Sequence, residues 1–144
     1  MQQRLLTMKT YTGVLKELPP NGVFCFGSNT QGRHGKGSAL YAYLYFGAVY
    51  GEPKGKHGSS WAIITKDLTK NYTPSITPGE IINGIAELYL YAFEHPELDF
   101  YVAYSGIGKN LNGYTPQEMA NMFSACPRPD NIIFEEEFSK LILL

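Results

Sequence analysis

Apolar positions along this chain fall into short continuous runs and longer periodic stretches that alternate with one another. Each change of pattern lies next to glycine, proline, serine or asparagine residues. A short apolar run between turn signals is typical of a strand that is buried on both faces of a sheet. Four such runs predict strands at residues 23–26, 61–65, 99–104 and 131–134.

Three stretches predict helices. Residues 38–46 are apolar or aromatic all round, which favours a mostly buried helix that ends at Gly47. Residues 78–95 predict a helix that follows the N-cap Thr77 and begins with Pro78 at its first position, and Glu80 has the spacing of a capping box. The same Thr-Pro-x-Glu signature at residues 115–118 predicts a helix that extends to about Phe123. The polar, glycine-rich residues 51–60 predict a loop, and an acidic turn precedes the apolar residues 141–144.

Strands that alternate with helices predict an α/β fold with a largely parallel central sheet. The chain has 144 residues, of which 44% are hydrophobic. This length suits one domain with a substantial core and is short for two. We therefore expect a single domain over residues 1–144.

Charge and cysteine usage narrow the class of partners and the compartment. A formal net charge of −1 offers no broad attraction to nucleic acid or to an anionic membrane, so phosphate recognition would have to be local. Cys25 lies in an apolar run and Cys126 stands before Pro127, which indicates packing roles and a reducing compartment rather than a disulfide framework. No apolar run approaches the roughly 20 residues of a membrane helix. These features predict a cytoplasmic protein without a membrane partner.

Two glycine-rich loops follow predicted strands, at residues 27–37 and 105–108. The carboxyl ends of parallel strands lie at one edge of a sheet, and ligands of such sheets bind there. Bare backbone N–H groups and a helix N-terminus can bind a phosphate at such a loop. A single glycine loop would suit a simple turn equally well, but two at neighbouring strand ends favour a nucleotide or phosphoester site.

Three sequence motifs carry a resemblance to a known family: FGSN at residues 26–29, GRHGKGSA at 32–39 and YSGIGKNLNGY at 104–114. Together they resemble the macrodomain-like proteins, whose members bind ADP-ribose and in some cases hydrolyse ADP-ribosyl linkages. With GAVYG at 47–51 and WAIITKD at 61–67, the chain looks like a small uncharacterised bacterial and phage branch. The resemblance implies a three-layer α/β/α macrodomain-like fold. It also implies ADP-ribose or a related NAD-derived nucleotide as ligand, with no cofactor.

The resemblance also implies roles for individual residues. Asn29 would bind the distal ribose, against which Tyr114 would pack, and the two loops would each hold one phosphate. The implied ligand-binding set is Ser28, Asn29, Arg33, Gly35, Lys36, Gly37, Ser38, Ser105, Gly106, Ile107, Gly108, Lys109, Asn110 and Tyr114.

His34 and Asp67 are the candidate catalytic residues. His34 can exchange a proton near neutral pH, and Asp67 follows the second strand, where a carboxylate can orient a water. Water would then attack the anomeric carbon or an ester of a phosphate-anchored ligand. The alternatives are a ligand or loop-bracing role for His34, a solvated loop acid for Asp67, and a turn residue that bonds its own backbone for Asn29.

The residue inventory does not favour metal or nucleophile chemistry. Three separated histidines and two cysteines do not form a zinc-binding set, and no Gly-x-Ser-x-Gly elbow or Gly-Lys-[Ser/Thr] phosphate loop is present. Two other functions remain open. One is a non-catalytic sensor or sponge for a nucleotide signal. The other is an interaction module whose glycine loops are only turns and whose aromatic helix at 38–46 contributes a self-association surface.

Overall fold

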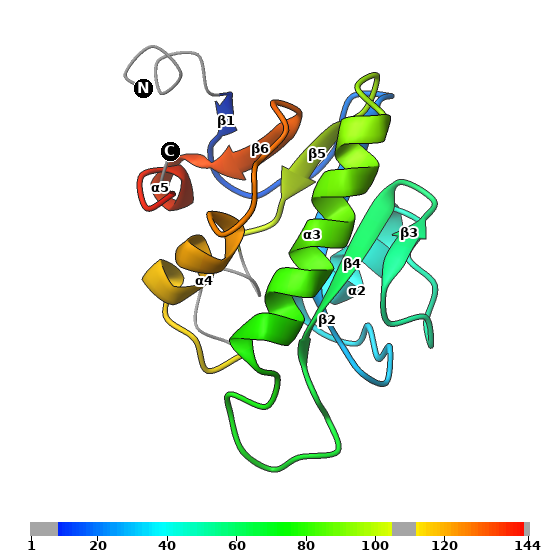
Figure 1. Ribbon diagram of the computed structural model, residues 1–144. Coiled ribbons are helices and arrows are strands. Elements are labelled where there is room, and N and C mark those ends of the chain that lie inside the picture. Colours follow the sequence, from blue (N-terminus) through cyan, green and yellow to red (C-terminus); the bar gives the residue numbers. More distant parts are fainter. Residues whose placement is uncertain (1–8, 105–111, 143–144) are drawn as a thin grey trace.

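The computed structural model describes residues 9–104 and 112–142 (Figure 1). Within these residues, six strands form one sheet in the order β1-β6-β5-β2-β4-β3. Neighbouring strands pair in parallel, except that β3 runs antiparallel to β4. The strands are β1 (Thr10–Tyr11), β2 (Gly22–Asn29), β3 (Gly55–His57), β4 (Ser60–Lys66), β5 (Asp99–Val102) and β6 (Ile132–Glu135).

Four helices complete the described fold, and three of them pack on the sheet from opposite sides. They are α2 (Gly37–Tyr45), α3 (Pro78–Glu94), α4 (Pro116–Phe123) and α5 (Glu136–Ser139). Figure 1 shows α3 in front of the sheet and α2 behind it, and α4 shares the core cluster of α3. The mixed α/β class and the mostly parallel sheet are therefore confirmed, whereas the specific macrodomain-like arrangement stays a prediction.

Successive residues of β2 explain why both faces of the sheet are covered. Side chains of a strand point alternately to its two faces. Val23 and Cys25 belong to the cluster that α3 and α4 complete, while Phe24 and Phe26 belong to the cluster that α2 completes. All four side chains are at most 3% exposed. The continuous apolar run is thus a strand buried on both faces, as its sequence predicts.

The predicted helix boundaries hold to within a residue or two. The side chain of Thr77 accepts a hydrogen bond from the backbone N–H of Glu80 at 3.2 Å, which caps α3. At α4, Thr115 and Glu118 form a complete capping box. Each cap satisfies backbone N–H groups that the first helical turn leaves without an intrahelical partner.

Three elements are missing from the sequence prediction. The expected loop at 51–60 contains β3, a three-residue edge strand that pairs with β4 but has no apolar alternation to reveal it. The two-residue β1 also has no apolar alternation in its sequence. A hydrogen bond from the Tyr11 hydroxyl to the Val102 carbonyl, 2.6 Å, holds it beside the sheet. The expected acidic turn is α5, whose first turn is capped by the Glu135 carboxylate on the N–H of Phe138, 2.9 Å.

Candidate functional site

The loops that follow β2, β4 and β5 meet at one edge, because these three strands run parallel. Thr30, which directly follows β2, is hydrogen bonded to Asp67 after β4 at 3.1 Å. Tyr114, beyond β5, donates from its hydroxyl to the carbonyl of Ile76 at 2.6 Å. The structure therefore brings the three segments together as the topology predicts. Ser105, Gly106, Ile107, Gly108, Lys109 and Asn110 lie outside the described residues.

Asn29 ends β2 and folds the glycine loop (residues 30–37) back on itself. Its side-chain oxygen accepts from the Arg33 N–H and its amide nitrogen donates to the Arg33 carbonyl, each at 2.9 Å. This is the turn-forming role that an asparagine side chain can play with nearby backbone. The neighbouring Ser28 is 3% exposed, and its hydroxyl lies 3.5 Å from the Asn29 carbonyl oxygen. A role of Asn29 at a ribose stays a prediction.

His34 points into the protein from the middle of the glycine loop. It is 1% exposed, and its ring meets that of Phe26 edge to face, with 5.3 Å between centroids. Its Nε2 lies 3.2 Å from the carbonyl oxygen of Glu52, and because a carbonyl oxygen only accepts, Nε2 is the donor in the tautomer that forms this hydrogen bond. Its Nδ1 is buried with no hydrogen-bond partner among the described residues. The geometry is that of a loop brace, and general acid–base catalysis by His34 stays a prediction.

The glycine loop also contacts the segment that follows α2. The Gly51 N–H donates to the Gly32 carbonyl at 2.8 Å. Gly32 has a φ of +64°, and a Cβ added there would lie 2.6 Å from the carbonyl carbon of Gly51. Only glycine fits both the left-handed backbone and this close approach. Gly32 therefore sets how the glycine loop lies against residues 51–52.

The glycine loop ends at the N-terminus of α2. Lys36 is the N-cap residue in extended backbone, and its side chain makes no capping hydrogen bond. The first turn of α2 contains no acidic residue, in contrast to Glu80 in α3 and Glu118 in α4. A Cβ added at Gly35 or Gly37 would meet nothing within 4 Å in the described structure. Arg33 and Lys36 are exposed beside this helix end, and Ser38, in its first turn, is half-buried.

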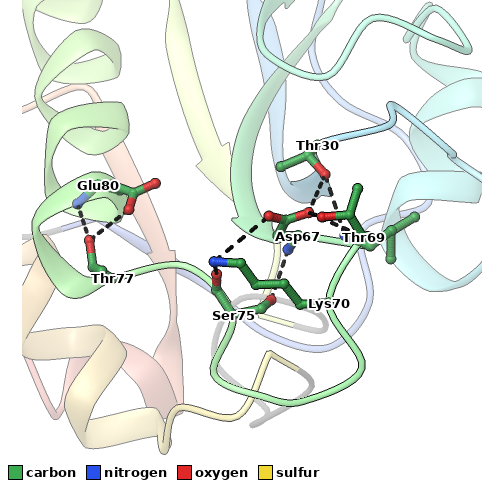
Figure 2. Close-up of polar contacts among 8 residues, drawn as sticks. Thr30, Asp67, Thr69, Lys70, Ser75, Thr77 and Glu80 are labelled. Carbon is green, nitrogen blue, oxygen red and sulfur yellow. Dashed lines mark hydrogen bonds and ion pairs between the residues drawn. The ribbon is translucent and has the colours of Figure 1, made fainter.

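Asp67 ties the loop after β4 to the glycine loop (Figure 2). One of its carboxylate oxygens, Oδ1, accepts hydrogen bonds from the Thr69 hydroxyl at 2.6 Å, the Thr69 N–H at 2.9 Å and the Thr30 hydroxyl at 3.1 Å. The other oxygen lies 3.9 Å from Lys70 Nζ. Ser75 contacts the backbone of Asp67, because the Ser75 hydroxyl accepts a hydrogen bond from the Asp67 N–H at 2.8 Å.

This network affects the chemistry open to Asp67. Hydrogen bonds from the Thr69 hydroxyl and N–H favour the ionised carboxylate, and together with the contacts to Thr30 and Lys70 they lower its pKa. A general base works best with a pKa near the operating pH. The lowered pKa and the occupied oxygen suit a loop anchor better than a proton acceptor, and the catalytic role of Asp67 stays a prediction.

Tyr114 is buried and is held by hydrogen bonds to neighbouring segments. It is 7% exposed, its N–H donates to the Asn112 side-chain oxygen at 3.1 Å, and its hydroxyl is bonded to Ile76. Gly113 has a φ of +93°, and a Cβ there would lie 2.8 Å from the Pro74 nitrogen. Tyr114 thus fastens the segment after β5 to the loop after β4.

The sequence prediction did not include Thr30, Thr69 and Ser75, which surround Asp67. A signal for Thr69 exists, because an aspartate followed two residues later by a threonine is typical of an Asx turn. Thr30 and Ser75 have no such signal, since their contacts join residues separated by 37 and 8 positions.

Comparisons with protein-family models, curated proteins and solved structures give no match. Membership of the macrodomain-like proteins therefore stays a prediction based on the motifs. Among residues 9–104 and 112–142, no group of three or more histidine, cysteine or acidic side chains is arranged to hold a metal ion. None of the helices described is long and apolar enough to cross a bilayer.

Proposed function

We propose that the carboxyl edge of the sheet binds a phosphorylated nucleotide, with a phosphate at the N-terminus of α2. The observation that carries this proposal is the contrast among the three longer helices of the described residues. α3 and α4 each begin with a threonine cap and a first-turn glutamate, whereas α2 has neither. A helix N-terminus without an acidic residue favours an external anion, because the helix dipole and the first-turn N–H groups attract negative charge.

The surroundings of α2 support the same ligand. Gly35 and Gly37 leave the backbone uncovered there, and the exposed Arg33 and Lys36 supply positive charge. Charge-assisted hydrogen bonds to a phosphate are shorter and about twice as strong as neutral ones. A net charge of −1 makes this positive group local rather than part of a broad basic surface.

ADP-ribose is the first ligand to test, because the motifs at residues 26–29 and 32–39 resemble those of macrodomain-like proteins. Under this proposal the helices on the two faces of the sheet form the outer layers of a macrodomain-like α/β/α fold. Asn29, turned toward Arg33, would shape the loop that receives the phosphate.

Binding without turnover is the form of the proposal that the geometry favours. His34 is 1% exposed and its Nε2 is bonded to the Glu52 carbonyl. Asp67 accepts three hydrogen bonds on one oxygen and has a lowered pKa. Both candidate proton-transfer groups therefore have structural roles, as a nucleotide sensor or sponge would allow.

Calorimetry with ADP-ribose, and with AMP, ribose 5-phosphate and NAD as comparators, tests the proposal. Gly35→Asp places a carboxylate near the N-terminus of α2, and we expect it to weaken ADP-ribose binding by about tenfold or more through charge repulsion. Gly79→Asp is the matched control, because Gly79 lies in the first turn of α3 and its Cβ would also meet nothing within 4 Å.

Equal binding by wild type and Gly35→Asp would contradict the placement of the phosphate. Failure of the wild-type protein to bind any of the four compounds would contradict the function itself. Chromatography of the NAD mixture reports turnover, because hydrolysis of the glycosidic bond of NAD gives ADP-ribose and nicotinamide. Release of ADP-ribose there would replace the binding-only form with a hydrolase.

A further inference from the structure

Tyr50 lies in the segment after α2 that is bound to the glycine loop. On one side of it, Gly51 donates its N–H to the Gly32 carbonyl at 2.8 Å. On the same side, the carbonyl of Glu52 lies 3.2 Å from His34 Nε2. These two contacts hold the backbone next to Tyr50 against the loop that leads to the N-terminus of α2.

The ring of Tyr50 is supported but uncovered. It meets the rings of His34 and Tyr43 at centroid distances of 6.2 Å and 5.9 Å, with interplanar angles of 71° and 73°. Neither neighbour stacks parallel to it, and the residue is 54% exposed. The ring of His34 packs in turn on the buried Phe26. Tyr50 is therefore an exposed aromatic ring that contacts the buried ring of His34.

We propose that Tyr50 is a specificity residue that stacks on the base of the nucleotide. This inference rests on the function proposed above. A nucleobase presents a flat π-face, and stacking on an aromatic side chain tolerates any base. Tyr50 would then distinguish nucleotides from simple sugar phosphates, without choosing among bases.

The spacing suits a single ligand that reaches both sites. Tyr43, which touches Tyr50, lies six residues beyond Gly37 in α2, or roughly 9 Å along the helix axis at 1.5 Å per residue. The ribose and phosphates of a nucleotide can bridge such a separation. His34 connects the two sites directly, because it belongs to the glycine loop and its ring contacts that of Tyr50.

Calorimetry on the full chain with ADP-ribose and ribose 5-phosphate tests this role. For Tyr50→Ala we expect ADP-ribose binding to weaken by about 5- to 150-fold, the range that loss of one stacked base gives. Binding of ribose 5-phosphate, which has no base, should stay within about twofold of wild type. Tyr50→Phe retains the ring and should bind ADP-ribose like the wild type.

Tyr45→Ala is the control for the loss of an exposed tyrosine, because Tyr45 is 64% exposed and its ring contacts that of Tyr41, with 4.7 Å between centroids. It should bind both compounds normally. Unchanged ADP-ribose affinity in Tyr50→Ala, beside a wild type that binds, overturns the stacking role alone. Equal weakening for both compounds also overturns it, because Tyr50 would then act by supporting the loop. A wild type that binds neither compound refutes the proposed function together with this inference.

Discussion

Replacing Gly32 with alanine perturbs the contact that positions the glycine loop. The φ of Gly32 is +64°, in the left-handed region. An added Cβ would lie 2.6 Å from the Gly51 carbonyl carbon, 2.7 Å from the Glu52 nitrogen and 2.9 Å from the Gly51 Cα. All three neighbours are backbone atoms, so no side chain can rotate away. We therefore expect Gly32→Ala to displace the backbone at residues 51–52.

The expected loss of stability in Gly32→Ala has two parts. The left-handed backbone costs an alanine about 1–2 kcal/mol, and the reduced entropy of the unfolded chain offsets about 0.4–1 kcal/mol of that. Forcing a methyl group into a filled space adds about 1–3 kcal/mol. The midpoint of the combined terms is about 3 kcal/mol, so we expect the free energy of unfolding to fall by about 2–4 kcal/mol. For a chain of this length, that lowers the melting temperature by about 6–12 °C.

Two matched variants separate these parts. Gly13 has a φ of +74° and its Cβ would meet nothing within 4 Å, so Gly13→Ala carries the backbone cost alone. We expect Gly13→Ala to lower the melting temperature by only about 3 °C. Gly35 has neither a positive φ nor a close neighbour, so Gly35→Ala should leave the melting temperature unchanged or raise it slightly.

The assay is thermal and urea unfolding of all three variants beside the wild type, monitored by circular dichroism. A loss of stability in Gly32→Ala no larger than that in Gly13→Ala would refute the close approach of Gly32 to Gly51. Because the shifted segment contains Glu52, whose carbonyl holds His34, the same variant should also bind ADP-ribose more weakly.

Three further predictions concern groups whose surroundings are well defined. The pKa of Asp67 lies below its ordinary value of 3.8, so its ionised form stabilises the fold above that pH and this contribution is lost as the pH falls through the folded-state pKa. The difference in free energy of unfolding between wild type and Asp67→Asn, measured by urea unfolding, should therefore shrink from neutral pH toward about pH 2. A difference that stays constant over this range would contradict the stabilising role of the ionised carboxylate. Burial raises the pKa of the Cys25 thiol, so in thiol titration of the native protein only Cys126, half-buried, should react, and two thiols should react after unfolding; two native thiols would contradict the burial. Tyr89→Phe removes a buried 2.6 Å hydrogen bond to the Phe123 carbonyl and should lower the free energy of unfolding by about 1–2 kcal/mol, whereas no change would mean that water replaces the hydroxyl.

Elements with a complete local signal could be predicted from the sequence. α3 and α4 each have a threonine cap, a first-turn proline and a glutamate at the third position, and both begin where these residues place them. The run at residues 23–26 predicts a strand buried on both faces, and β2 is such a strand. β1 and β3 have two and three residues, too few for an apolar period. β1 exists through pairing with the distant β6, whereas β3 pairs antiparallel with β4, from which only two residues separate it.

The candidate site also has one part that the sequence predicts and another that it does not. The order of strands and glycines predicts loops that meet at the carboxyl edge, and the bonds from Thr30 to Asp67 and from Tyr114 to Ile76 show that they do. The side-chain directions were not predictable. Whether His34 faces solvent or the core depends on Phe26 and on the carbonyl of Glu52, which lie 8 and 18 residues away in the sequence.

By itself the sequence determined the α/β class, the caps of α3 and α4, and a glycine-rich start for α2, because these depend on residues within one turn or one strand. Only the tertiary structure decided that Asn29 is bonded to Arg33, that Asp67 is a loop anchor and that Tyr50 stands beside His34. The last two depend on contacts between separate segments. The first lies within one loop, but an asparagine permits several local bonds, and the fold of the glycine loop selects among them.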